Sequence, residues 1–352
     1  MQELEQWAAT GRTEPLRRYR FSSEIRRELL ALHKLDNWHG LVAVLTDYLV
    51  IGAAIFAVES ASGPLASLLY VCALPVIATR FRAFTSLMHE SSHGILAKSR
   101  WLNRFFATYC SSYLVLLPRT SPWPATHVKG HHKHFGDPIR DPDLKAQIDL
   151  GIHSTKSEKE FTQRHLIAPI LGLRTHLFIK GALTGIWGNF KSSDRREVAQ
   201  MLLFVSTLFG AVVYWGGGRL LLLYWLVPLL AVCPLIHWYT ELVDHFPLLP
   251  CSARTDVEAS RHRAVGFVTR HLLGIHNEGY HLDHHLSPGI PFWNLPKAHK
   301  IRMKDAFYAD WIRRSTGLRG NRRAFWWQLA DLGHYFKGTS VQRFEAESAA
   351  VS

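Results

Sequence analysis

Two histidines one helical turn apart, in the segment MHESSHG, have the spacing of a metal site. His89 and His93 are four residues apart, so on a helix they share a face. With Glu90 they also form His-Glu-x-x-His, the pattern of zinc metalloproteases, in which the glutamate acts as general base. The segment therefore allows two chemistries: hydrolysis at one zinc ion, or ligation within a larger metal centre.

Two further histidine clusters favour the larger centre. The segment THVKGHHKH has the spacing H-x3-H-H, and YHLDHHLSP has the spacing H-x2-H-H. On an α-helix the first two histidines of H-x2-H-H share a face, and the third projects about 100° from the second, so one segment can reach two ions. Eight neutral imidazoles are too many for one tetrahedral zinc and suit two transition-metal ions. They are His89, His93, His127, His131, His132, His281, His284 and His285.

Four long apolar runs indicate a membrane protein, because a spanning helix needs about 20 apolar residues. The predicted spans are residues 41–58, 64–80, 200–215 and 219–238. Lys and Arg are scarce in the two short connections and frequent in the N-terminal, central and C-terminal segments, which places both termini and the histidine clusters in the cytoplasm. The net charge of +13 is then explained by basic residues that bind anionic lipid headgroups. Nucleic acid is not an expected partner, because no binding motif accompanies the charge.

Two further apolar stretches are expected to lie in the membrane interface. Phe105–Pro118 is too short to span comfortably, and Leu166–Gly188 is interrupted by Arg174, His176 and Lys180. If only one of these stretches crossed the membrane, one histidine cluster would be separated from the others. Convergence of the histidines therefore predicts amphipathic interfacial helices at both.

The three clusters and their flanking residues resemble the integral-membrane fatty acid desaturase and hydroxylase superfamily, in its bacterial type. DPIRDPD (Asp137–Asp143) resembles the Asp-Pro-Asp that often follows the second histidine box, and NEGYHLDHHLSPGIPFWNLPKAH resembles the third box with its trailing Leu-Pro-x-x-His. The resemblance covers about Leu41 to His299.

The resemblance implies an all-α membrane protein, with four transmembrane helices in two hairpins, interfacial helices, and a cytosolic helical domain that carries a histidine-ligated dimetal site. The expected layout is a basic cytosolic segment (1–38), a membrane desaturase-like domain (39–338) and a disordered tail (339–352).

The segment HWYTELVDHFP resembles an additional box of some members, in which an acidic residue and a histidine end the fourth span. It maps onto Asp244 and His245, with His237 as the rival for a ninth ligand. His134, His276 and His299 are expected to be structural. No catalytic residue is expected apart from the metal centre. Side chains that could orient the ligating imidazoles, as metal-bound histidines usually require, are Glu90, Asp137, Asp141, Asp143, Asp244, Asn277 and Asp283.

The function that the resemblance implies is an O2-dependent fatty acyl desaturase with two non-haem iron ions, acting on an acyl-lipid, acyl-CoA or acyl-carrier-protein substrate. A diiron hydroxylase or ketolase of an alkane, carotenoid or other lipid is the alternative, because histidine boxes do not separate the two outcomes. An intramembrane zinc protease leaves six box histidines unexplained. A metal transporter would need more polar residues in the spans than Asp47.

Electrons are expected from a separate donor. The chain has four cysteines but no C-x-x-C pair of the rubredoxin kind, and no cytochrome b5-like module. A ferredoxin-like protein with an NAD(P)H reductase is the predicted partner, steered by complementarity to the basic face. The expected location is a bacterial inner membrane, with the active site on the cytoplasmic side.

Overall fold

The computed structural model describes residues 16–118, 127–137, 139–155, 157–191, 195–246, 248, 254–263, 270–271 and 273–315. Within these ranges the regular structure is helical, apart from one isolated bridge between Arg17 and Thr255. The all-α prediction is therefore confirmed. The predicted disordered tail, 339–352, lies outside the described residues, and the predicted domain boundaries stay predictions.

The chain forms two compact units. We call one the histidine unit (Met1–Lys34, Thr126–Ile170 and Tyr239–Ser352) and the other the apolar-helix unit (Leu35–Ala125 and Leu171–Trp238). Each is described by itself.

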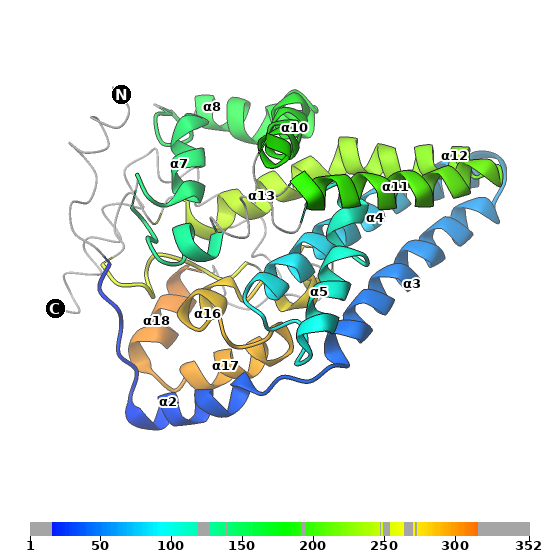
Figure 1. Ribbon diagram of the computed structural model, residues 1–352. Helices are drawn as coiled ribbons and strands as arrows, with labels where there is room; N and C mark the ends of the chain where they lie inside the picture. The colour runs from blue at the N-terminus through cyan, green and yellow to red at the C-terminus, as the bar shows by residue number, and fades with distance from the viewer. Residues whose placement is uncertain are drawn as a thin grey trace. The chain divides into compact units, whose positions relative to one another are not determined.

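Four helices of the described chain are long and apolar enough to cross a membrane. They are α3 (His39–Glu59), α4 (Gly63–Ser92), α11 (Arg195–Tyr214) and a helical run, Gly218–His245, that comprises α12 (Gly218–Leu221), η5 (Leu222–Leu226), η6 (Pro228–Val232) and α13 (Cys233–His245). Each contains most of one predicted span. In the apolar-helix unit, α3 and α4 pack side by side (Figure 1). Crossing of a bilayer as two hairpins stays a prediction.

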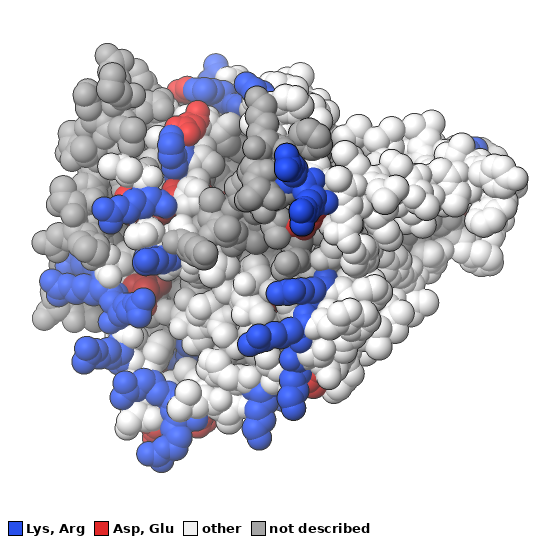
Figure 2. Space-filling view, in the orientation of Figure 1, with Lys and Arg blue, Asp and Glu red and all other residues white. Residues whose placement is uncertain are grey.

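The surface of these helices is apolar. Leu49, Phe56 and Leu203 are each at least 70% exposed, which suits contact with lipid rather than water. Figure 2 shows almost no charged side chains over α3, α11 and α12. The unit contains a buried ion pair, in which Arg80 Nη1 lies 3.3 Å from Oδ1 of the fully buried Asp47. Such pairing is how an ionised residue is accommodated within membrane helices.

The two stretches predicted to lie in the interface form short helical segments. The first contains part of α5 (Arg100–Thr108) and η2 (Ser112–Val115), and the second contains α9 (Ala168–Ile170) and much of α10 (Thr175–Lys191). At 17 residues, α10 is about 26 Å long, less than the roughly 30 Å of a hydrocarbon core. Neither stretch is therefore among the four candidate spans, and its place in the interface stays a prediction.

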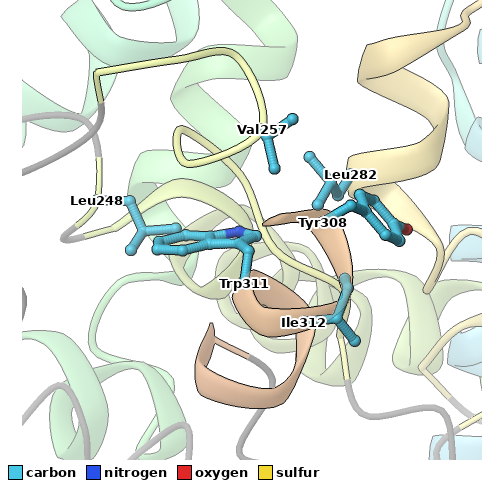
Figure 3. Packing of buried hydrophobic residues seen from close by; sticks show 6 residues of the cluster. All are labelled: Leu248, Val257, Leu282, Tyr308, Trp311 and Ile312. Atoms are coloured by element: carbon cyan, nitrogen blue, oxygen red, sulfur yellow. The ribbon is translucent and has the colours of Figure 1, made fainter. Parts of the chain in front are cut away.

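Short helices around an apolar cluster build the histidine unit. They include α2 (Ser23–Leu30), α7 (Pro142–Asp149), α16 (His281–Leu286), α17 (Leu295–Arg302) and α18 (Ala306–Ser315). Figure 3 shows Leu282 of α16 packed with Tyr308, Trp311 and Ile312 of α18. Removing this apolar area from water stabilises the position of α16.

Candidate metal centre

The second histidine cluster lies on a π-helical turn, η3 (His127–His131). Its register is set by a hydrogen bond from the backbone N–H of His132 to the carbonyl of His127, 3.0 Å, five residues apart. In such a turn the residues four and five positions after His127 lie on either side of it, so all three imidazoles of H-x3-H-H face one way. The α-helical geometry used for H-x2-H-H does not hold here. π-turns are frequent at functional sites.

The Asp-Pro-Asp segment orients this cluster. Asp141 caps α7 by accepting hydrogen bonds from the N–H groups of Asp143 and Leu144, and Pro142 occupies the first helical turn. His131 Nδ1 lies 2.8 Å from Asp141 Oδ1, and His127 Nδ1 lies 3.0 Å from Asp143 Oδ2. Because a carboxylate accepts, each Nδ1 carries a proton and each Nε2 is left as a lone-pair donor.

A glycine allows α7 to approach the cluster this closely. A Cβ on Gly130 would lie 2.9 Å from Cδ of Pro142, which is nearer than real Cβ contacts. A side chain at this position would keep the Asp-Pro-Asp turn away from His127 and His131, which explains the glycine in THVKGHHKH.

The third cluster is α16. His281 and His285 are one turn apart with their Nε2 atoms separated by 3.1 Å, and His284 projects to another side. There its Nε2 lies 3.2 Å from that of His132, whereas His285 Nε2 lies 3.3 Å from that of His131. One helix thus contributes to two groups of ring nitrogens.

His245, at the C-terminal end of α13, joins the second group. Its Nδ1 donates to the carbonyl of Ala259 (3.1 Å), and its Nε2 lies 3.0 Å from that of His281. The donor atoms of His131, His245 and His285 lie within 4.8 Å of one another. So do those of His127, His132 and His284.

These contacts fit a bound cation. Nδ1 of both His131 and His245 is committed to an acceptor, so their Nε2 atoms carry lone pairs that converge with those of His281 and His285. Converging lone pairs repel one another unless a proton or a metal ion lies between them. Imidazole nitrogens suit zinc, copper, iron and nickel ions.

The pKa values of the cluster depend on burial and on the two carboxylates. Burial lowers the pKa of His281 and His285 well below the usual value, and neighbouring histidines lower it further. Burial also disfavours charged His131, but Asp141 and Asp143 outweigh this effect and raise its pKa to about 9. A proton therefore occupies the His131 cluster when no cation does, and a metal ion would displace it.

A half-buried histidine outside these groups, His153, gives a pH-dependent prediction. Burial, followed by the nearby His165, lowers the pKa of His153 from 6.5 to about 3. Below pH 6.5 the unfolded chain binds a proton that the folded chain rejects, so stability is present above pH 6.5 and is lost as the pH falls towards 3. Within that window His153→Gln should reduce the acid-induced loss of stability by about 1.4 kcal/mol per pH unit. Melting temperatures of both proteins between pH 7 and pH 4 measure this, and parallel curves would contradict it.

The first histidine pair belongs to the apolar-helix unit. α4 runs without a break from the apolar segment through His89, and His93 caps its C-terminal end. The helix therefore extends twelve residues beyond the end of the predicted span, 64–80. The two rings have centroids 4.8 Å apart, and Glu90 lies 3.7 Å from His89 Nδ1.

The remaining predicted residues take other partners. Asp137 accepts hydrogen bonds from the backbone N–H groups of Ile139 and Arg140, and Asn277 donates to the carbonyl of Phe292. Asp244 is held by Arg263, with His281 Nδ1 at 3.5 Å. Asp283 faces away from the histidine groups, towards three residues that the sequence interpretation did not single out: His262, Arg302 and Tyr308. His299, which was expected to be structural, lies there too, with its Nδ1 3.4 Å from Asp283 Oδ2.

Comparison with known proteins supplies the family. The family model described as fatty acid desaturase matches residues 63–317, which include all nine histidines. The chain belongs to the fatty acid desaturase family. It is an oxidoreductase, and the resemblance inferred from its histidine spacing is confirmed.

Three bacterial relatives carry desaturase names. Dihydrorhizobitoxine desaturase of Bradyrhizobium elkanii is 33% identical over 82% of this chain and 82% of its own length. The sn-1 oleoyl-lipid 12-desaturase of Anabaena variabilis is 25% identical over 63% of the present chain and 65% of its own length. The sn-1 acyl-lipid omega-3 desaturase (ferredoxin) of Nostoc sp. (strain 36) is 25% identical over 62% and 63%.

Proposed function

We propose that this desaturase introduces a double bond into the acyl chain of a membrane lipid, at a centre of two iron ions held by nine histidines. The observation that carries the proposal is the convergence of histidine Nε2 atoms from η3, α13 and α16. In two of these histidines, His131 and His245, Nδ1 already donates to an oxygen, so Nε2 is left with a lone pair.

The ligands divide into two sets by their contacts. His131, His245, His281 and His285 would hold one ion. His127, His132 and His284 would hold the other. The spacing of the first histidine box adds His89 and His93 to the proposed ligands. Two ferrous ions would supply the activation of O2 that removes hydrogen from an unactivated C–H bond. The protein's part is to fix the imidazoles: Asp141 and Asp143 hold His131 and His127, and the Ala259 carbonyl holds His245.

The chain is proposed to cross a bacterial inner membrane with both termini and the metal centre on the cytoplasmic side. Four apolar helices and the distribution of Lys and Arg support this topology. The 30 residues of α4 span about 45 Å, more than a hydrocarbon core of about 30 Å, so its histidine end would project into the cytoplasm.

A ferredoxin-like protein with an NAD(P)H reductase is the proposed electron donor. One relative has ferredoxin in its name, and exposed basic residues of the histidine unit would attract an acidic partner. Figure 2 shows Lys and Arg gathered over the region of α2, α17 and α18. Its exposed members include Arg26, Arg27, Lys297, Lys300 and Lys304.

Dihydrorhizobitoxine is a second candidate substrate, because a relative named for it is 33% identical over 82% of the chain. An acyl lipid is favoured by the membrane helices and by the names of the other two relatives. Oxygen insertion in place of desaturation is separated by the same experiment.

The test is expression of the full chain in a bacterial host that lacks desaturases, followed by mass spectrometry of its lipids. Loss of two hydrogens from an acyl chain is the expected result, and one added oxygen would point to hydroxylation instead. A parallel culture is given dihydrorhizobitoxine, and its conversion with unchanged lipids would overturn the acyl-lipid proposal. A count of about two irons per purified chain is expected, and the His131→Ala variant is the inactive control.

A further inference from the structure

The helix that carries three of the nine histidines, α16, has only six residues. Isolated helices shorter than about 12–15 residues are marginal in water, so α16 depends on its surroundings. At about 100° per residue, His281 and His285 lie on one side and Asp283 lies on the other. The position of the imidazoles is therefore set by what Asp283 contacts.

Arg302, the last residue of α17, binds the side of α16 that faces away from His281 and His285. Its Nη1 donates to Asp283 Oδ1 and lies 3.4 Å from the Asp283 carbonyl, and its Nη2 donates to Ser287 Oγ at 2.5 Å. Asp283 is fully buried and Arg302 is 1% exposed. A cation at a helix C-terminus also offsets the partial negative charge of the last carbonyls.

Three more side chains contact the other carboxylate oxygen of Asp283, Oδ2. Tyr308 Oη lies 2.9 Å from Asp283 Oδ2, and the ring nitrogens His262 Nε2 and His299 Nδ1 lie at 3.0 and 3.4 Å. Both nitrogens also lie 3.0 Å from Tyr308 Oη and 3.2 Å from each other. The network thus joins α16, α17, α18 and the segment that contains His262.

Charge decides between a metal ion and a hydrogen-bonded network at this cluster. Asp283, His262 and His299 are spaced closely enough for a third ion. Arg302 already neutralises the single carboxylate, however, so a buried divalent cation would lack a compensating anion. The protons on Tyr308 and on the two rings can instead be directed to oxygen acceptors, with Asp283 Oδ2 and Tyr308 Oη receiving them.

We infer that this network positions α16, and that Arg302, His299, His262 and Tyr308 are positioning residues for the histidines of the metal centre. The inference rests on the proposed function, in which His281, His284 and His285 bind iron. It gives the histidine of Leu-Pro-x-x-His a role: α17 carries both His299 and Arg302, one turn apart on the side that faces Asp283.

The experiment uses the full chain in detergent, with Arg302→Met, Arg302→Lys, His299→Gln and Tyr308→Phe. Ile312→Val is the matched control, because it removes a methylene from the same buried cluster and leaves the network intact.

Two quantities are measured: amide hydrogen exchange of the α16 peptide without metal, and ferrous-ion affinity. Arg302→Met and His299→Gln should speed exchange in α16 more than in α7, and weaken iron binding about 10–100-fold. Arg302→Lys should restore part of both, whereas Ile312→Val should lower only the melting temperature.

Several outcomes would overturn the inference. Unchanged α16 exchange and iron affinity in His299→Gln, whose side chain is 20% exposed and tolerant of change, would remove the positioning role. A third ion per wild-type chain that His299→Gln alone releases would make the cluster a metal site. Failure of the proposed function would be distinguishable from these outcomes. The wild-type chain would then bind no iron, whereas Arg302→Met would still speed hydrogen exchange in α16.

Discussion

Replacing His131 by alanine should lower desaturase activity more than about 100-fold, beyond the 10–100-fold range of changes to residues that merely orient a metal ligand. His131 is 1% exposed, is held by Asp141, and presents its Nε2 to His285. Alanine removes a donor that no neighbouring water can replace in so buried a place. Double-bond formation in the host lipids and the number of irons per chain should fall together.

The control for this prediction lies three residues further along the chain. His134→Ala removes an imidazole from the same segment, but His134 is partly exposed and belongs to neither group of converging nitrogens. Activity and iron content within about twofold of the wild type are expected, in line with the small effects of changes away from a site. If His131→Ala kept both irons and its activity, the proposed ligand set would be wrong.

Arg263→Met should cause a large loss of stability in the histidine unit. Arg263 is 2% exposed and donates to both oxygens of Asp244 at 2.7 and 2.6 Å, and to Glu278 at 3.2 Å. Removing one partner of a buried ion pair leaves an uncompensated charge and costs about 3–5 kcal/mol. A melting temperature lower by about 10 °C follows from about 2–4 °C per kcal/mol.

An exposed arginine in the same unit serves as the comparison. Arg313 lies 3.7 Å from Asp310 with 65% of its side chain exposed, so Arg313→Met should change stability by less than about 0.5 kcal/mol. Equal melting temperatures for the two variants would mean that the Arg263–Asp244 pair contributes little. Arg263→Lys should lie between, because an ammonium group keeps the charge but lacks the planar fork of five N–H donors that lets Arg263 bind Asp244, Glu278 and the Leu273 carbonyl together.

Sequence spacing predicts the parts of the metal centre that are local in the chain. The histidines of α16 share a helical face as their spacing predicts. Asp-Pro-Asp was interpreted only through its resemblance, although an aspartate followed by proline is also a typical helix start, as α7 shows. Long-range contacts were less predictable. Asp283 lies between ligands in sequence, yet its contacts with Arg302 and His262 depend on how α17 and the segment before α16 pack.

Two signals in the chain were readable but not used. His299 and Arg302 are three residues apart on α17, a spacing that places both on one face, and the helical phase of His281 and His285 already turns Asp283 away from them. The π-turn at His127 was less accessible, because its extra residue per turn depends on packing against α7 rather than on any local propensity.

Because α4 is continuous, the position of its histidine end is fixed relative to its apolar segment. Each residue adds about 1.5 Å of length and about 100° of rotation, so one residue inserted near Leu69 would move His89 and His93 outward and swing them to a different direction. Seven inserted residues would nearly restore the direction but add about 10 Å of height. In the proposed topology, both the depth and the direction of His89 and His93 thus depend on the number of residues in α4 that precede His89.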